Sequence, residues 1–215
     1  MSELFSIQLQ NRQQQGRDGV WLDLPTTTEQ VQAALRQIGI SSDNPQGLFI
    51  SGYFAEEEKR FAIPYNMVLA SNVDELNFLA SRLETLSTGE RAELNAALQA
   101  PQSELFSIGR ITDFPENVDY YVHLPDVHGP AQLGDYYLNR SGMVDMPEEW
   151  KGGIDTAQFG RYVAQQEQGA FTQYGYLVKS GDKWQKVYEG QPVPEEYRVL
   201  FLPAPEILRD AANIP

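Results

Sequence analysis

Residues 5–54, FSIQLQNRQQQGRDGVWLDLPTTTEQVQAALRQIGISSDNPQGLFISGYF, combine strand and helix patterns within one short stretch. FSIQL and VWLDL alternate apolar and polar side chains, as half-buried strands do, and Gly16 and Gly19 mark a turn between them. Thr26 and Glu29 have the spacing of a capping box before EQVQAALRQIG, whose apolar side chains fall on one helical face. GLFISGYF predicts a third strand, so this segment indicates an α+β fold.

The following segment has helical periodicity. In VDELNFLASRLE, which starts at residue 73, the leucines share one face and the polar side chains the other. Ser87 and Glu90 form a second capping box, which opens a shorter helix. Because the pattern switches from strand-like to helical and back, we predict three small domains: an N-terminal α+β domain at 1–62, a helical domain at 63–110 and a C-terminal α+β domain with an extended tail at 111–215.

The last segment mixes both patterns again. VDYYVHL predicts a strand, PAQLGDYYLNRSG a helix starting at Pro130, and IDTAQFGRYVAQQEQG a second helix. AFTQYGYLVKSGDKWQKVYEG predicts a hairpin about Ser180, Gly181 and Asp182. The proline-rich tail from Pro192 onward is expected to be extended.

Charge decides which partners are possible. The chain has 30 Asp and Glu against 16 Lys and Arg, a net charge of -14. A surface of this sign repels nucleic acid and attracts proteins that bind it, so direct nucleic-acid binding is not expected. General solubility explains an acidic composition equally well. However, residues 71–150 carry 14 acids and 4 bases, a difference of -10, and solubility does not require that concentration.

Several classes of site and location are disfavoured by what the sequence contains. The absence of cysteine excludes disulfides, thiol nucleophiles and thiolate metal sites. The start of the chain has no cationic segment followed by an apolar stretch, and no run of eighteen apolar residues occurs. We therefore expect a soluble, cytoplasmic protein that does not contact membranes.

The strongest pattern for catalysis is HLPDVH, where His123, Asp126 and His128 offer two imidazoles and a carboxylate. Pro125 and the Gly129–Pro130 pair break the regular geometry that zinc motifs use, so a surface turn explains this stretch better than a metal site. There is also no GxGxxG or Walker loop. The sequence thus predicts a protein that is not an enzyme and uses no cofactor or metal.

The acidic residues divide into two groups. Glu29, Glu75, Glu90, Glu148 and Glu149 occupy expected first-turn positions, where a carboxylate is explained by helix amides and the helix dipole. The remaining acids of the middle segment are candidates for an array that imitates phosphates: Asp74, Glu84, Glu93, Glu104, Asp113, Glu116, Asp119, Asp126, Asp135 and Asp145.

Aromatic residues between about 130 and 180 exceed what a small domain needs to fill its core. They predict a homodimer interface, for which the candidates are Tyr136, Tyr137, Trp150, Phe159, Tyr162 and Phe171.

Three stretches together resemble the ArdA antirestriction family. The first contains Asn11, the two glycines and WLDLP; the second is VDELNFLASRL; the third comprises LGDYYL and IDTAQFGRYVAQQEQGAFTQYGYL. None is specific alone, but all three occur in order over residues 5–178. The sequence departs from the family pattern at Gln10, where a tyrosine is usual, in a longer loop from Asn11 to Trp21, and in residues 180–215, which extend beyond the family body.

The resemblance implies an elongated chain of three small domains that dimerises through its C-terminal region. It also implies carboxylates arranged like DNA phosphates and a Type I restriction-modification enzyme as the protein partner, so that incoming mobile DNA is protected. Two alternatives stay open: an acidic adaptor for another basic DNA-associated protein, and a metal-dependent hydrolase that uses His123, Asp126 and His128.

Overall fold

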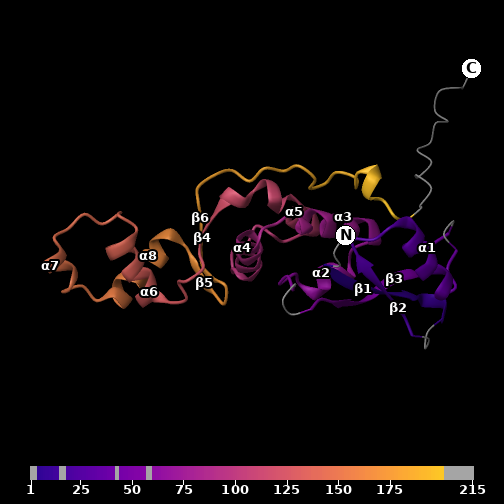
Figure 1. Cartoon of the computed structure of the whole chain (residues 1–215), viewed down its shortest axis with the longest axis horizontal. Coiled ribbons are helices and arrows are strands. Elements are labelled where there is room, and N and C mark those ends of the chain that lie inside the picture. Colours follow the sequence, from indigo (N-terminus) through magenta and orange to yellow (C-terminus); the bar gives the residue numbers. More distant parts are fainter. Residues whose placement is uncertain (1–3, 15–17, 42–43, 57–59, 201–215) are drawn as a thin grey trace, which may run out of the picture. The chain divides into compact units, whose positions relative to one another are not determined.

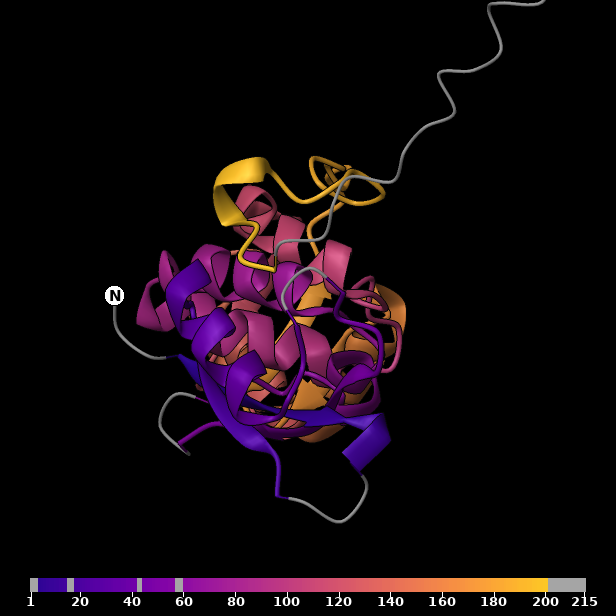
Figure 2. The ribbon, with the colours of Figure 1, turned by 90° about the vertical axis from the view of Figure 1, so that its right-hand side faces the viewer.

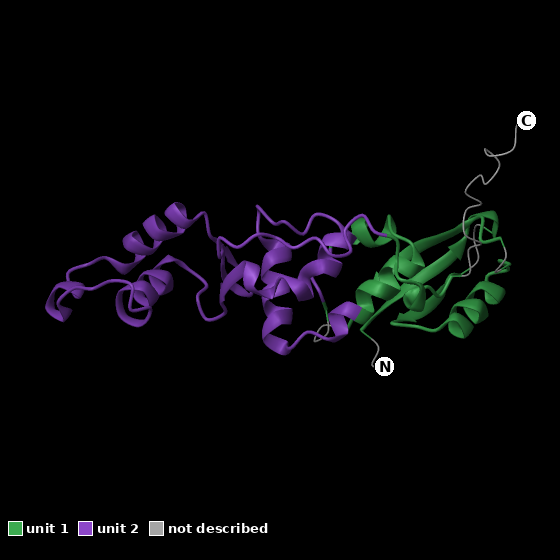
Figure 3. Cartoon of the chain, turned by 90° about the horizontal axis from the view of Figure 1, so that it is seen from above, with its two compact units in different colours: residues 1–60, 64–81, 192–215 green, residues 61–63, 82–191 purple. Residues whose placement is uncertain are grey.

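The computed structural model describes residues 4–14, 18–41, 44–56 and 60–200. Contacts divide the chain into two compact units, coloured in Figure 3. Unit 1 comprises residues 1–60, 64–81 and 192–215, and unit 2 comprises residues 61–63 and 82–191. Each unit combines helices with an antiparallel sheet, which confirms the α+β class. The finer division at residues 62 and 110 stays a prediction.

Unit 1 is built on a three-stranded sheet in the order β2-β1-β3, antiparallel throughout. Figure 1 labels its elements, which are β1 (Phe5–Asn11), the 3-10 turn η1 (Arg12–Gln14), β2 (Val20–Leu24), α1 (Thr28–Gln37), β3 (Leu48–Phe54), α2 (Tyr65–Leu69), the first part of α3 (Val73–Glu84) and the 3-10 turn η6 (Glu195–Tyr197).

The two faces of this sheet differ in burial. Ile7, Leu9 and Leu24 are fully buried on one face of the sheet. The helix α1 lies beside the sheet (Figures 1 and 2), and its residues Val31 and Leu35 are buried as well. The alternation of FSIQL and VWLDL places polar side chains and Trp21 on the opposite face. The three predicted strands of this segment are confirmed.

The first helix begins one residue later than predicted. Its capping box is formed by Thr27 and Gln30, whose side chain and main chain bond reciprocally, and not by Thr26 and Glu29. The Thr26 amide donates instead to Oδ1 of Asn77, at 2.7 Å. This long-range bond selects which of three consecutive threonines caps the helix. The second predicted capping box, Ser87 with Glu90, is confirmed.

Unit 2 contains a second sheet, in the order β4-β6-β5, and the helix α4 contacts its strands β4 and β6. Its elements are the end of α3, α4 (Thr88–Gln99), α5 (Ile108–Asp113), the 3-10 turns η3 (Phe114–Glu116) and η4 (Val118–Tyr120), β4 (Tyr121–Leu124), α6 (Pro130–Asp135), the π-helical turn η5 (Tyr136–Arg140), α7 (Glu148–Lys151), α8 (Thr156–Glu167), β5 (Ala170–Thr172) and β6 (Gly175–Lys179).

The closest helix packing in unit 2 is between α6 and α8. Gly134 of α6 and Gly160 of α8 face each other: a Cβ at Gly134 would overlap the carbonyl oxygen of Thr156, and one at Gly160 would overlap that of Pro130. Both glycines are buried. The two predicted helices are confirmed, and glycine at these two positions lets their backbones meet.

The predicted hairpin about Ser180, Gly181 and Asp182 is wrong. The hairpin forms earlier, between β5 and β6, with Thr172 paired to Gly175 across a two-residue turn. Gly175 has φ +119, a conformation that favours glycine. After β6 the chain forms no further strand as far as residue 200, because its amides bond to side chains of unit 2 and then of unit 1, as described below.

Candidate partner-binding surface

Four of the ten candidate acids are exposed at the surface of unit 2: Glu116, Asp119, Asp126 and Asp145. Asp119 lies in η4, Asp126 follows β4, and Asp145 lies between η5 and α7. Asp126 and Asp145 thus lie in connections between elements, which usually run over the surface of a protein. Together with Glu116, which forms an ion pair with Arg82, these three carboxylates are the members of the predicted array that solvent or a partner can reach directly.

Asp113 does not belong to a surface array. Its side chain is fully buried at the end of α5. It accepts main-chain N–H bonds from Tyr188 at 2.6 Å and from Val187 and Glu189 at 3.3 Å each. Burial of an aspartate is tolerated here because amide donors surround its carboxylate. Asp113 therefore anchors the segment after β6.

Asp74 has a similar role in unit 1. Its Oδ1 accepts N–H bonds from Val199 at 2.7 Å and Leu200 at 2.8 Å, and both of these residues are buried. The side chain is half-buried in the first turn of α3. Asp74 thus binds the main chain of Val199 and Leu200 at the end of the described residues, and its Oδ1 is already hydrogen-bonded to two amides.

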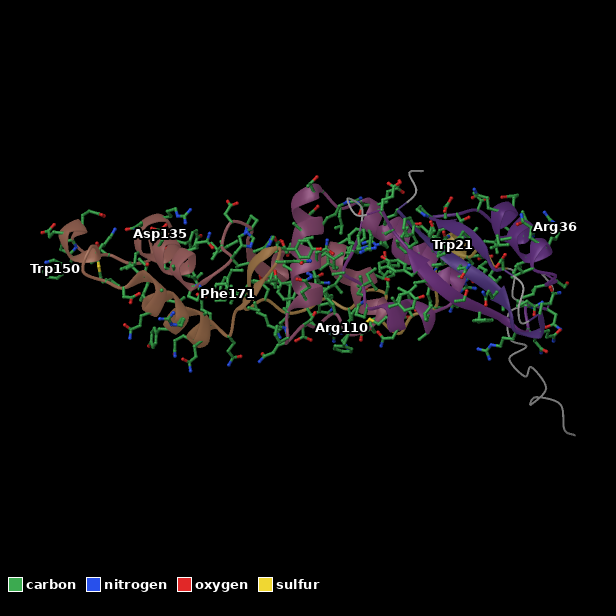
Figure 4. All side chains as sticks on the ribbon, turned by 90° about the horizontal axis from the view of Figure 1, so that it is seen from below. Trp21, Arg36, Arg110, Asp135, Trp150 and Phe171 are labelled. Carbon is green, nitrogen blue, oxygen red and sulfur yellow. The ribbon has the colours of Figure 1, made fainter. Side chains whose placement is uncertain are left out.

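Three of the candidates form ion pairs within unit 2. Glu116 contacts Arg82 at 2.5 Å, Asp135 contacts Arg140 at 3.0 Å, and Glu104 lies between Arg110 at 3.0 Å and Lys179 at 2.7 Å. The hydrogen bond from Lys179 is the main cause that lowers the pKa of Glu104. Each of these acids has a neighbouring cation that cancels part of its local field. Figure 4 labels Asp135 and Arg110.

Glu93 differs from the other acids because it is half-buried among negative charges. Burial, and then the charges of Glu90 and Asp119, raise its pKa to about 8. Among the described residues, no hydrogen-bond partner reaches its buried Oε1. Glu93 is therefore mostly protonated at neutral pH and adds little negative charge. Glu84 is half-buried in the last turn of α3.

The acids assigned to helix starts lie where the sequence placed them. Glu90 bonds to Ser87 through its side chain, and hydrogen bonds with Ser87 lower the pKa of Glu90. Glu75 accepts from the amide of Asn72 at 3.2 Å. Glu148 and Glu149 lie in the first turn of α7.

The aromatic dimer candidates separate by exposure. Trp150 and Tyr162 are 67% and 59% exposed. Tyr136, Tyr137, Phe159 and Phe171 are half-buried; Tyr137 donates to Glu167, and Phe171 packs on the core around Tyr176. Figure 4 labels Trp150 and Phe171. Of the six, Trp150 and Tyr162 are the most exposed to solvent.

Aromatic, amide and charged side chains hold the segment after β6, residues 180–191, within unit 2. Trp184 packs edge-on against Tyr120, with ring centroids 5.1 Å apart. The Asn117 side chain pairs with the main chain of Gln185, accepting its N–H at 2.7 Å and donating to its oxygen at 2.9 Å. The buried Arg110 bonds to Glu189 at 3.2 Å. Residues 180–191 are therefore a fixed part of unit 2.

The histidines do not assemble with the nearby aspartate as the hydrolase alternative requires. His123 Nε2 lies 2.7 Å from the carbonyl oxygen of Tyr174, which the nitrogen can contact only as a donor. His128 and Asp126 are exposed in the loop before α6. Within residues 4–14, 18–41, 44–56 and 60–200, no three His, Asp or Glu side chains form a group suited to a metal ion.

Comparison with protein families identifies the chain. The family model described as "Antirestriction protein (ArdA)" matches residues 15–178, which is more than half of the chain. The chain belongs to the ArdA antirestriction family. Membership implies an antirestriction function, and the predicted resemblance is confirmed. No curated protein matches the chain.

The residues that carry the ArdA resemblance are largely structural. Asn11 donates to the carbonyl of Ile38 at 3.1 Å, which ties the end of β1 to the end of α1. Asn77 of the VDELN stretch accepts from Thr26 and donates to the Tyr197 carbonyl at 2.9 Å. Gly160 of the FGR stretch permits the α6–α8 contact. These three residues of the motifs serve the fold of the chain.

The ArdA match ends within β6, so residues 179–200 are an addition beyond it. Asp113 and Asp74, which the sequence suggested as phosphate mimics, bind this addition through main-chain amides. Across the described residues, each helix is too short or too polar to cross a lipid bilayer.

Two exposed residues of the WLDLP stretch were not singled out by the sequence prediction. Trp21 and Asp23 are both exposed on the outward face of β2. The strict alternation of VWLDL was a sufficient signal, because it places both side chains opposite the buried Leu22 and Leu24.

Proposed function

We propose that this ArdA chain binds the DNA-binding groove of a Type I restriction-modification enzyme and imitates DNA there, so that incoming mobile DNA escapes cleavage. Family membership supplies the antirestriction function. The observation that supports mimicry is the net charge of -14 together with the exposed carboxylates Asp119, Asp126 and Asp145. A cationic groove attracts such a surface as it attracts phosphates.

The amount of charge sets a limit on what one chain can imitate. Duplex DNA has one charge per about 1.7 Å of axis, so fourteen charges correspond to roughly 24 Å, or about seven base pairs. A single chain therefore replaces a short site, and a homodimer doubles the length. The exposed rings of Trp150 and Tyr162 support a dimer interface in the C-terminal part of the chain.

The proposal has no catalytic step, because occupation of the groove is sufficient to exclude DNA. An acidic adaptor for another basic DNA-associated protein has the same surface requirements and differs in its target. The test is the plating efficiency of unmodified phage on cells that contain a Type I system, with and without this protein.

The proposal predicts that expression of the chain restores plating toward the level of cells without the restriction system. A strain with a Type II enzyme in place of the Type I system is the control for target class. Unchanged plating on the Type I strain, with the protein present and folded, would contradict the proposed function.

A further inference from the structure

The outward face of the unit 1 sheet carries an exposed aromatic surface next to a carboxylate. Trp21 on β2 is 50% exposed and Phe54 on β3 is 52% exposed, and their rings meet edge-on with centroids 6.5 Å apart. We define Trp21, Asp23, Gly52 and Phe54 as the aromatic platform. Figure 4 labels Trp21 on this sheet.

The indole of Trp21 lies across the sheet. Trp21 is paired with Gln8 of β1, which is paired in turn with Gly52 of β3. A Cβ at Gly52 would lie 3.0 Å from Cη2 of the indole, so the ring spans β1 and its tip rests on a position that has no side chain. Glycine at position 52 therefore lets the ring lie against the sheet, while half of Trp21 stays exposed to solvent.

Asp23 lies two residues further along β2 on the same face. Its Oδ1 accepts a hydrogen bond from the Ser6 hydroxyl of β1 at 2.8 Å, so the carboxylate leans over the same central strand as the indole. The side chain is exposed. A carboxylate has about four acceptor sites, so one hydroxyl bond leaves capacity for a second donor.

This combination fits one kind of side chain. A guanidinium stacks on an indole face through its planar cation and donates two parallel hydrogen bonds to a carboxylate. An ammonium lacks the planar stacking surface, and a phosphate is repelled by Asp23. The opposite signs of an arginine and of this platform, on a chain of net charge -14, make a basic protein surface the matching partner.

We propose that the aromatic platform is a docking surface for arginine side chains of the basic protein that this chain binds. The inference rests on the proposed function for the partner's identity, but its chemistry can be tested separately. The platform adds to inhibition a contact that is not phosphate mimicry, because a phosphate has no aromatic face on which a guanidinium can stack.

The first test uses hexa-arginine and hexa-lysine peptides with the full chain. Both peptides carry the same charge, so general attraction to an acidic protein cancels in their affinity ratio. We expect hexa-arginine to bind at least about threefold more tightly, and to shift the Trp21 indole N–H signal in NMR more than those of Trp150 and Trp184.

Variants of the chain test whether the preference for hexa-arginine arises at the aromatic platform. Trp21→Ala should reduce the affinity ratio to about one, and Asp23→Asn, which changes no packing, should reduce it in the same direction. Val122→Ala, which removes a 45% exposed strand residue from the other sheet, should retain the ratio. An unshifted Trp21 signal, or an arginine preference that survives both Trp21→Ala and Asp23→Asn, would overturn the inference.

The second test uses the Type I enzyme. Trp21→Ala should weaken binding about tenfold with the net charge unchanged, whereas Val122→Ala should not. If the wild-type chain does not bind the enzyme, the proposed function fails, and the peptide experiment still decides the platform. If wild type and Trp21→Ala bind the enzyme equally, the platform is excluded as a docking surface while mimicry stands.

Discussion

Replacement of Asp113 by alanine should destabilise unit 2 strongly, although the sequence places this residue among the surface acids. The carboxylate is fully buried and accepts three main-chain N–H bonds, one short at 2.6 Å and two long at 3.3 Å. Loss of one strong charge-assisted bond and two weak ones, with the amides left buried, should cost about 3 kcal/mol. Asp113→Asn should also destabilise, because either orientation of its amide directs N–H groups at one of these donors.

The measurement is urea unfolding followed by tryptophan fluorescence, in a background with Trp21→Phe and Trp150→Phe. Trp184 then reports on the segment that Asp113 anchors. Asp119→Ala is the matched control, since an exposed aspartate should change stability by less than about 0.5 kcal/mol. Equal midpoints for Asp113→Ala and Asp119→Ala would refute the reasoning that amides from residues 187–189 explain this buried charge.

Three further outcomes are expected. Gly160→Ala should destabilise by about 2 to 4 kcal/mol in thermal unfolding, because its Cβ overlaps the Pro130 carbonyl, whereas Gly89→Ala, in open space, should not; equal melting temperatures would contradict the helix contact. Folding raises the pKa of Glu93 from the ordinary value of 4.5 to about 8, so the free energy of unfolding of the wild type should fall as pH rises through this range. Glu93→Gln, which cannot ionise, should make that fall shallower. Parallel pH profiles of the wild type and Glu93→Gln would exclude Glu93 as the cause of the pH dependence. Light scattering should give about twice the 24.3 kDa chain mass, and Trp150→Ser with Tyr162→Ser should return the monomer mass; an unchanged mass in the double variant would place the interface elsewhere.

Local patterns predicted most of the regular elements. Period-two alternation identified the strands of unit 1, and helical periodicity with Ser87 and Glu90 identified α4. The predictions were wrong where a contact with a residue distant in the sequence determines the local structure. Thr26 and Thr27 are equally good caps by sequence, and the bond between the Thr26 amide and Asn77, 51 residues away, decides between them.

The candidate site was harder to predict because exposure is not a local property. Asp113 and Asp119 are both acids near short helical turns, yet one is fully buried and the other exposed. The difference arises because the amides of residues 187–189 bind Asp113, and no sequence pattern around position 113 predicts that contact. The same bonds explain the wrong hairpin, since the amides that would pair as a strand are engaged by Asp113 and Asn117.

Competition with DNA for a purified Type I enzyme tests mimicry most directly, with two variants that change the net charge equally. One replaces Asp119, Asp126 and Asp145 by asparagine. The other replaces three exposed acids of unit 1, Asp18, Glu195 and Glu196, by their amides. Mimicry by the middle segment predicts that the first variant competes at least about tenfold more weakly than wild type while the second changes less, and that added salt weakens the wild-type complex steeply. A folded first variant that competes with DNA as strongly as wild type would contradict it.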